Sequence, residues 1–284
     1  MGGVVVVVPA LDVEATLSRQ LAALDAQTDL DFRVVISDNG STDGTRRIAA
    51  AWPPRFARLD VVDSSARRGV ASARNIAIRA TQEELILICD ADDRVHPGWV
   101  AAMRAALAVS PAATGPLVII SPDEPKRRDV WNADSVPVSM NYRPYMPGCN
   151  MGMRREVFNA AGGFDASLDR GQEDVDFGWR ITGLGNTITH SRDASLDYYQ
   201  RSGLRNFLRQ QYRYGRAHVA LYDKHRDEPI VTASWKTSLR WFIEWVKLVP
   251  RTLREGQFRG AAGAAVFQAA RCLESLRRRT RSPL

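Results

Sequence analysis

Short apolar runs and longer helix-like stretches alternate along the first 120 residues. The runs are rich in β-branched residues and bounded by polar turns, at Val4–Val8, Phe32–Ser37, Leu59–Val62, Leu85–Cys89 and Leu117–Ile120. Helix-like stretches separate them, at Val13–Ala26, Asp43–Trp52, Val70–Ala80 and Pro97–Val109. Such runs are typical of strands buried on both faces, and their alternation with helices indicates βαβ units. The sequence therefore predicts an α/β fold with a mostly parallel central sheet flanked by helices.

The pattern changes after residue 120. Residues 121–147 contain five prolines and little periodicity, which predicts a long irregular loop. A short strand and two helices are expected next, at Asn150–Met153, from Arg154 and at Asp174–Ile181. The rest is helical, at Gly203–His225, Ala233–Leu253 and Gly260–Arg279. We predict one domain over residues 1–215, with halves of about 1–120 and 121–215, and a basic helical extension over 216–284.

The helix expected at Ala233–Leu253 has an apolar face with basic edges. Trp235, Phe242 and Val246 share this face, and Lys236 and Arg240 flank it. A Trp-rich face with basic shoulders is typical of a helix that lies in a membrane interface. Packing against the domain, or in a homodimer interface, would give the same pattern, so both interpretations stay open.

Charge is distributed unevenly along the chain. The net charge is +7, but residues 201–284 contain 18 Lys and Arg against 6 Asp and Glu, and residues 1–200 carry −5. A basic segment favours anionic surfaces such as phospholipid, a lipid-linked phosphate or nucleic acid. Nucleic acid is not expected as a partner, because the segment has no RNP, KH or helix-turn-helix signature.

Composition indicates a globular protein. The 284 residues are 45% apolar and 25% charged, enough to build a core. The sequence has no secretory signal and no run near the roughly 18 apolar residues of a membrane span. Cys89, Cys149 and Cys272 lack the spacing of a disulfide framework or a zinc site. We expect a cytoplasmic protein, either free or peripheral on the inner face of the membrane.

An acidic turn follows the strand expected at Leu85–Cys89. It places Asp90, Asp92 and Asp93 within four residues at the carboxyl end of a parallel strand, where open α/β sheets bind ligands. Three carboxylates so close repel one another unless a cation neutralises them, and Mg²⁺ prefers one or two carboxylates plus substrate phosphates. The turn therefore predicts a divalent metal site, and the alternative is a solvated acidic turn before a helix.

Three further segments carry candidate chemistry, each with a structural alternative. Asp38 ends the second strand and is suited to bind a nucleobase or ribose, although the turn that follows also caps a helix. Gly69 opens a helix whose amino end can face an anion, with Arg74 one turn in. Glu173 and Asp174 begin another helix, where a carboxylate can act as a general base or simply suit the helix dipole.

The order of these segments resembles family 2 glycosyltransferases of the inverting, Rossmann-like GT-A fold. The resemblance covers about residues 3–215 and is specific as a combination, although no single motif is. It rests on Val5–Pro9 with Asp12, Leu24–Gln27, Phe32–Asp43, Gly69–Asn75, Leu87–Asp93, Gly148–Met153, Gly162–Asp165 and Glu173–Phe177. Asp12 stands where the family usually has asparagine, and Asn39 follows Asp38.

The resemblance implies a metal-assisted transfer of one sugar from a nucleotide-diphosphate sugar to a hydroxyl acceptor, which is a glycan, a lipid-linked intermediate or a small molecule. Asp174 would be the base, and Asp92 with Asp90 would hold Mg²⁺ or Mn²⁺. Acceptor contacts are implied at Gly148, Asn150 and Glu173. Nucleotide-sugar contacts are implied at Pro9, Ala10, Leu11, Asp12, Asp38, Asn39, Gly69, Arg74, Asp90 and Ala91.

The sequence departs from the family pattern near the diphosphate. Many relatives carry a His or Arg motif there, and this chain has Tyr198-Tyr199-Gln200-Arg201. Arg201 is planar and always charged, so it is a candidate to clamp the phosphates. The segment at 210–216 only loosely resembles the QxxRW motif of processive members, so single-sugar transfer is expected.

Two other classes of function fit parts of the pattern. A nucleotidyltransferase that makes nucleotide sugars shares an α/β nucleotide site, but it normally has a glycine-rich phosphate loop where this chain has Pro9–Asp12. A GT-A-like binding protein without catalysis is the other alternative, and the intact acidic segments argue against it.

Overall fold

The computed structural model describes residues 2–121, 128–168, 170–230, 232–233 and 258–283. By compactness the chain divides into two units. The first comprises Met1–Pro137, Pro144–Asp169 and Glu173–Gln200, and the second comprises Val138–Arg143, Arg170–Gln172 and Arg201–Leu284. Helix α7 (Leu204–Lys224) contains residue 215, and the domain boundary expected between 215 and 216 stays a prediction.

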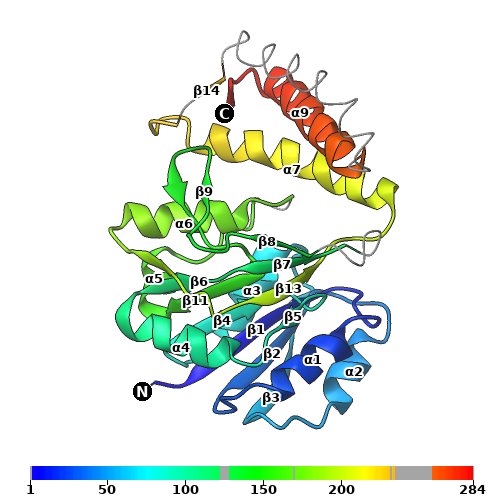
Figure 1. Cartoon of the computed structure of the whole chain (residues 1–284), viewed down its shortest axis with the longest axis vertical. Coiled ribbons are helices and arrows are strands. Elements are labelled where there is room, and N and C mark those ends of the chain that lie inside the picture. Colours follow the sequence, from blue (N-terminus) through cyan, green and yellow to red (C-terminus); the bar gives the residue numbers. More distant parts are fainter. Residues whose placement is uncertain (1, 122–127, 169, 231, 234–257, 284) are drawn as a thin grey trace. The chain divides into compact units, whose positions relative to one another are not determined.

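A seven-stranded sheet forms the centre of the first unit (Figure 1). Its order is β12-β6-β11-β4-β1-β2-β3, and every strand is parallel to the others except β11. The strands are β1 (Val4–Ala10), β2 (Arg33–Asp38), β3 (Arg58–Asp63), β4 (Leu85–Cys89), β6 (Ala112–Thr114), β11 (Asn150–Arg154) and β12 (Ile188–His190). The predicted α/β fold with a mostly parallel central sheet is confirmed.

A second sheet has the order β5-β13-β7-β8, with β13 parallel to β7 and the other neighbours antiparallel. Its strands are β5 (Arg94–Val95), β7 (Leu117–Ile120), β8 (Arg128–Trp131) and β13 (Leu196–Tyr199). The part of the expected 121–147 loop that is described is therefore partly regular, with β8, β9 (Val138–Ser139) and β10 (Arg143–Pro144). Strand β8 pairs with β7, and the hydrophobic pattern of residues 128–131 alone did not predict a strand there.

Helices cover both faces of the central sheet. They are α1 (Leu17–Asp25), α2 (Thr45–Ala51), α3 (Val70–Arg79), α4 (Trp99–Val109), α5 (Arg155–Ala160) and α6 (Glu173–Gly183). The alternation of β1 decides which face each residue meets, because successive side chains of a strand point to opposite faces. Val4, Val6 and Val8 pack with α1 and α4, and Val5 and Val7 pack with α3, α5 and α6.

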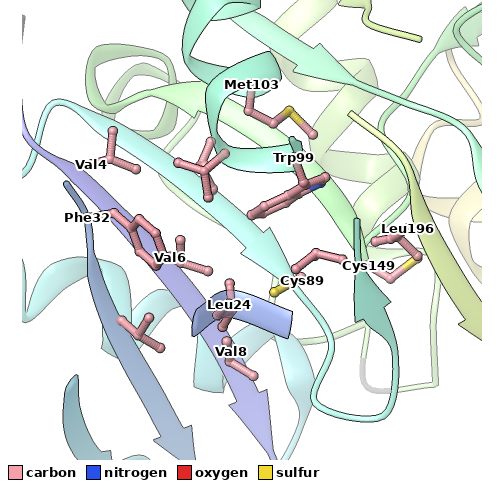
Figure 2. Packing of buried hydrophobic residues seen from close by; sticks show 14 of the residues in the cluster. Val4, Val6, Val8, Leu24, Phe32, Cys89, Trp99, Met103, Cys149 and Leu196 are labelled. Carbon is pink, nitrogen blue, oxygen red and sulfur yellow. The ribbon is translucent and has the colours of Figure 1, made fainter. Parts of the chain in front are cut away.

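The first of these clusters leads to the carboxyl end of β4. Figure 2 shows Val4, Val6 and Val8 on one side of β1, with Phe32, Leu24 and Trp99 around them and Cys89 and Cys149 at the far end. The five valines of β1 are at most 2% exposed, and burying each contributes roughly 1.5–3 kcal/mol relative to leaving it in water. The acidic turn after Cys89 therefore directly follows a closely packed part of the core.

In the second unit, α7 packs beside α9 (Phe258–Arg278), and β14 (Thr232–Ala233) pairs with β15 (Ser282–Pro283). The two helices run in the same direction, since Phe207 lies against Gly263 and Asp223 pairs with Arg278. A Cβ at Gly263 would lie 2.6 Å from the Phe207 ring, so this close approach requires glycine. The helix predicted at Ala233–Leu253, with its Trp-rich face, lies outside the described residues apart from Ala233.

No helix of the described residues is both long enough and apolar enough to cross a bilayer. All three cysteines are free, with Cys89 and Cys149 buried and Cys272 exposed.

Candidate active site

The acidic turn follows β4 directly. Asp90, Asp92 and Asp93 each offer a carboxylate oxygen, and these oxygens lie within 4.8 Å of one another. The Asp90 side chain is 31% exposed, whereas Asp93 is 1% exposed. The carboxylates of Asp90 and Asp92 are therefore partly exposed to solvent, and that of Asp93 is buried.

Helix α1 holds this turn in place. The Gln20 amide donates to the carbonyl of Asp90 at 3.2 Å, and its oxygen accepts from the backbone N–H of Val95 at 3.1 Å. Arg19 donates to the carbonyl of Asp92, and its guanidinium stacks 3.7 Å above the centre of the Tyr199 ring. Two polar side chains of one helix thus fix the backbone on both sides of Ala91.

Asp93 is the buried member of the turn. One of its oxygens accepts from the backbone N–H of Tyr199 at 3.0 Å, and the other has no hydrogen-bond partner among the described residues. Burial and the charges of Asp90 and Asp92 raise the pKa of Asp93 well above its usual range. An unsatisfied buried carboxylate oxygen beside two further carboxylates fits a hard divalent cation, which takes oxygen ligands.

Arg74 connects this turn to a distant helix. It lies on α3 and is 2% exposed. Its Nη1 donates to Glu173 Oε1 at 2.8 Å, and its Nη2 contacts Asp90 Oδ1 at 3.3 Å and the carbonyl of Gly148 at 3.0 Å. Burial lowers the pKa of Arg74, but the charges of Asp90, Glu173 and Asp174 outweigh it and raise that pKa above its ordinary value. The guanidinium is therefore a permanent cation between acidic groups.

Gly148 extends the contact to Asp174. Its carbonyl accepts from Arg74, and its N–H donates to Asp174 Oδ2 at 2.9 Å. A Cβ at Gly148 would lie 2.7 to 3.1 Å from the guanidinium, so a side chain here would displace Arg74. The backbone of one residue, Gly148, thus contacts both the arginine and the carboxylate.

Glu173 and Asp174 differ in their surroundings. Glu173 is 5% exposed, and burial together with the charge of Asp174 raises its pKa to about 7 although Arg74 opposes the shift. Asp174 is partly exposed, and Asp174 Oδ1 also accepts from the N–H of Val175 at 2.9 Å. Burial raises the pKa of Asp174 as well, against the effects of Arg74 and the backbone N–H groups. The partly exposed Asp174 is the better placed of the two to meet a ligand.

The turn after β2 lies at the same edge of the sheet. Asp38 is 2% exposed, accepts from the N–H of Ser41 at 3.0 Å and lies 3.8 Å from Arg46 Nη1. Asn39 is 4% exposed and spans the loop before α3, because its amide donates to the carbonyl of Ser64 at 2.6 Å and accepts from the N–H of Gly69 at 2.7 Å. Gly69 has φ 123°, a conformation that favours glycine.

The turn after β1 completes the edge. Ala10 is buried, Leu11 is 40% exposed and Pro9 is half-buried. Asp12 has φ 52°, and its carboxylate accepts from the N–H of Thr42 at 2.7 Å. Its N–H in turn donates to the Ser41 hydroxyl at 3.0 Å, so the turns after β1 and β2 are joined.

Comparison with known proteins decides the family. The model of glycosyl transferase family 2 matches residues 5–162, more than half of the chain. The chain belongs to glycosyl transferase family 2. It is accordingly a transferase. The turns after β1, β2 and β4 and the loop before α3 all lie within the matched residues.

Curated relatives of this family 2 glycosyltransferase are distant in sequence. Glycosyltransferase AglE of Haloferax volcanii is 23% identical over 226 residues, covering 76% of this chain and 73% of its own. Validoxylamine A glucosyltransferase of Streptomyces hygroscopicus is 28% identical over 225 residues, covering 66% of this chain and 50% of its own. N-acetylglucosaminyl-diphospho-decaprenol L-rhamnosyltransferase of Mycobacterium tuberculosis is 23% identical over 268 residues, covering 80% and 84%.

Solved structures show the same fold. The mannosyltransferase PcManGT of Pyrobaculum calidifontis, in complex with GDP-Man and Mn²⁺, has a TM-score of 0.68 at 19% identity and covers 97% of this chain and 87% of its own. GalNAc-T7 with UDP, GalNAc and Mn²⁺ has a TM-score of 0.59 at 17% identity, covering 80% and 49%. The GT-A fold expected from the sequence is confirmed.

The family 2 glycosyltransferase places most of its predicted site residues at one edge of the central sheet. Two of the predicted contact residues are enclosed by protein groups. Asn150 is 0% exposed, accepts from Trp99 Nε1 at 2.8 Å and donates to the carbonyl of Ala194 at 2.9 Å. The amide of Asn39 hydrogen-bonds to Ser64 and Gly69, and ligand contacts of Asn150 and Asn39 stay predictions.

Arg201 belongs to the second unit and is exposed. Its carbonyl accepts from Arg259 at 2.5 Å, and its role at the diphosphate stays a prediction. Sequence reasoning missed Gln20 and Arg19, which hold the acidic turn. Two adjacent polar residues on a largely apolar helix were the available signal, but they do not say which turn they reach.

Proposed function

We propose that this enzyme transfers a single sugar from a nucleotide-diphosphate sugar to a hydroxyl group of an acceptor, with inversion at the anomeric carbon. The observation that carries the proposal is one buried guanidinium in contact with both candidate half-sites. Arg74 contacts Asp90 of the acidic turn and Glu173 of α6, and Gly148 joins it to Asp174. A donor held at the turn and an acceptor held at α6 would therefore meet within one constellation.

On the donor side, Asp90, Asp92 and Asp93 would hold Mg²⁺ or Mn²⁺. When bound, the cation stabilises the negative charge that develops on the leaving diphosphate. Asp38 would bind the nucleobase with the turn of Pro9 to Asp12, and Arg201 would bind phosphate. The structures of PcManGT with GDP-Man and Mn²⁺ and of GalNAc-T7 with UDP, GalNAc and Mn²⁺ support a site for a nucleotide and a metal.

On the acceptor side, Asp174 would act as the general base. It would take the hydroxyl proton as the acceptor oxygen attacks the anomeric carbon and the nucleoside diphosphate leaves from the opposite face. Asp174 suits this role because it is partly exposed and its raised pKa favours proton uptake. Glu173 is buried against Arg74, so it would orient the acceptor side.

The acceptor that we favour carries its hydroxyl on a lipid-linked intermediate. The support is the name of one relative, an N-acetylglucosaminyl-diphospho-decaprenol L-rhamnosyltransferase, which spans most of this chain. A soluble glycan or a small molecule would use the same chemistry.

A thermal-shift panel tests the proposal most directly. The Tm of the protein is measured in the presence of UDP-, GDP- and dTDP-sugars, each once with manganese and once with EDTA. Bound ligand stabilises the folded state by about 2.7 kcal/mol at 100 times its Kd, which is a rise in Tm of several degrees. One nucleotide class should give this rise with manganese only, and NMR of its transfer product should show the inverted anomer. No shift with any sugar nucleotide, or a retained anomer, would contradict the proposal.

A further inference from the structure

Helix α7 carries a row of arginines on its first turns. Arg205, Arg209 and Arg213 recur every four residues and are exposed, and we call them the cationic stripe. Residues four apart on a helix lie one above the other on the same face. The stripe is therefore a continuous ridge of positive charge and not three scattered groups.

The opposite side of α7 is occupied by α9. A Cβ at Gly215 would lie 2.3 Å from the carbonyl of Phe267, and one at Gly263 would lie 2.6 Å from the Phe207 ring. Arg216, by contrast with the stripe, turns to Glu274 on α9, with Nε and Oε2 2.7 Å apart. The helix therefore uses one side for packing and leaves the stripe on the other.

Among the described residues, no acidic side chain compensates the charge of the stripe. From Leu204 to Tyr222 the helix contains four arginines and no acidic residue. Arg205, Arg209 and Arg213 make no ion pair with any residue in the described parts of the chain. Unpaired, exposed arginines in a row create a local positive potential that attracts an anionic surface.

Apolar side chains border the stripe. Leu204, Leu208 and Tyr212 each precede one of its arginines, and Leu204 and Tyr212 are 40% and 39% exposed. Leucine and tyrosine beside arginine match the boundary between headgroups and acyl chains, where both kinds of side chain find a partner. A nucleic-acid backbone would satisfy the arginines but not the leucine.

We propose that the cationic stripe and its apolar border dock this enzyme on a bilayer that contains anionic phospholipid. The arginines bind headgroup phosphates, and Leu204 and Tyr212 enter the interface. This places the contact on α7, which the sequence pattern alone did not single out. It goes beyond the proposed transfer reaction, since it concerns where the enzyme works and not what it transfers.

Vesicle co-sedimentation of the full chain tests the docking. Wild type should bind vesicles of equal parts phosphatidylglycerol and phosphatidylcholine, and not vesicles of phosphatidylcholine alone. Binding should weaken between about 0.1 M and about 0.5 M NaCl, because salt screens exposed charges. The stripe variant Arg205→Glu/Arg209→Glu/Arg213→Glu should lose at least about tenfold in affinity, since each basic residue contributes to binding an anionic surface.

The matched control is Arg47→Glu/Arg55→Glu/Arg79→Glu. These three arginines are also exposed, and the change in net charge is the same. The control should keep vesicle binding within about threefold of wild type, and the unfolding curves of both variants should match that of wild type. Equal loss in both triples would assign the binding to overall charge, and no binding by wild type would overturn the docking.

Two further measurements sharpen the result. Leu204→Ser/Tyr212→Ser should weaken vesicle binding while leaving its salt dependence unchanged, which a purely electrostatic contact would not do. Wild type should also bind a DNA duplex more weakly than the anionic vesicles at equal salt. Tighter binding to DNA, lost in the stripe variant, would assign the surface to nucleic acid and contradict the proposal.

Discussion

The guanidinium of Arg74 and the carboxylate of Glu173 form a buried ion pair with Nη1 and Oε1 2.8 Å apart. The same guanidinium contacts Asp90, so one arginine joins the acidic turn to the start of α6. The side chain of Arg74 is 2% exposed and that of Glu173 is 7% exposed, and water does not replace either partner.

Asp92→Asn should abolish turnover and leave the fold intact. The substitution removes one of the three carboxylates that fit a divalent cation, while its backbone carbonyl still accepts from Arg19. Activity is measured with the nucleotide sugar that stabilises the protein, with manganese and with excess EDTA. Asp193→Asn, at an exposed position, is the control and should stay active. Full activity of wild type in EDTA would refute the need for metal.

Asp174→Asn should lower kcat by at least about a hundredfold, the usual contribution of a general base. Its amide can still accept from Gly148, so donor affinity should change little. Steady-state kinetics and donor binding by calorimetry separate the two effects. If this variant has normal turnover and Glu173→Gln is inactive, Glu173 is the general base and Asp174 is not.

Arg74→Ala should destabilise the fold by about 3 kcal/mol or more. Removal of one partner leaves an uncompensated buried charge, here on Glu173, and such losses are large. Urea unfolding at pH 8 measures the change. Arg79→Ala on the same helix is exposed and should cost less than about 1 kcal/mol. Similar losses in both variants would mean that the buried ion pair is not what stabilises this region.

Gly148→Ala should destabilise the protein by about 1–3 kcal/mol and reduce turnover. The new methyl group would lie 2.7 to 3.1 Å from the Arg74 guanidinium and force it away from Asp90 and Glu173. Gly98→Ala is the matched control, because a Cβ there meets nothing within 4 Å. If both glycine variants behave like wild type, the close approach of Gly148 to Arg74 is not required.

Stability should fall as pH rises from about 4.5 to 7, and Glu173→Gln should reduce that fall. The pKa of Glu173 is raised from 4.5 to about 7 in the folded protein. As the pH rises, the Glu173 carboxyl therefore loses its proton in the unfolded chain before it does so in the folded protein. Its contribution to the free energy of unfolding is full below pH 4.5 and lost above pH 7. The difference is about 3 kcal/mol. Urea unfolding at pH 4.5 and 8 in EDTA measures it, and parallel pH slopes for wild type and variant would refute the raised pKa.

Most strands and helices of the first 120 residues could be predicted because each has an apolar pattern of its own. Val4 to Val8 and Ile86 to Cys89 are buried on both faces, and their uninterrupted apolar pattern indicates that burial directly. The strand β6 (Ala112–Thr114) could not be found in this way, since it has three small residues and owes its place to pairing with β11 and β12.

The site was predictable in its acidic residues and not in its partners. Asp90, Asp92 and Asp174 stand at strand and helix ends, where chemistry is expected. The contact of Arg74 with Glu173 depends on long-range packing, which no local pattern reports. The surroundings of Asn150 depend on long-range packing too, because only its neighbours Trp99 and Ala194 show that both ends of its amide are hydrogen-bonded within the core.

The reversed strand β11 has a consequence for synthesis of the chain. It lies between β4 and β6, and β6 pairs only with β11 and β12, which are made later. A nascent chain that has reached residue 120 can form β4-β1-β2-β3, but the apolar strand β4 then stands at an open edge. Such edges invite pairing with other chains until they are covered. Emergence of residues 150–154 from the ribosome is therefore the step that closes the sheet and ends this exposure.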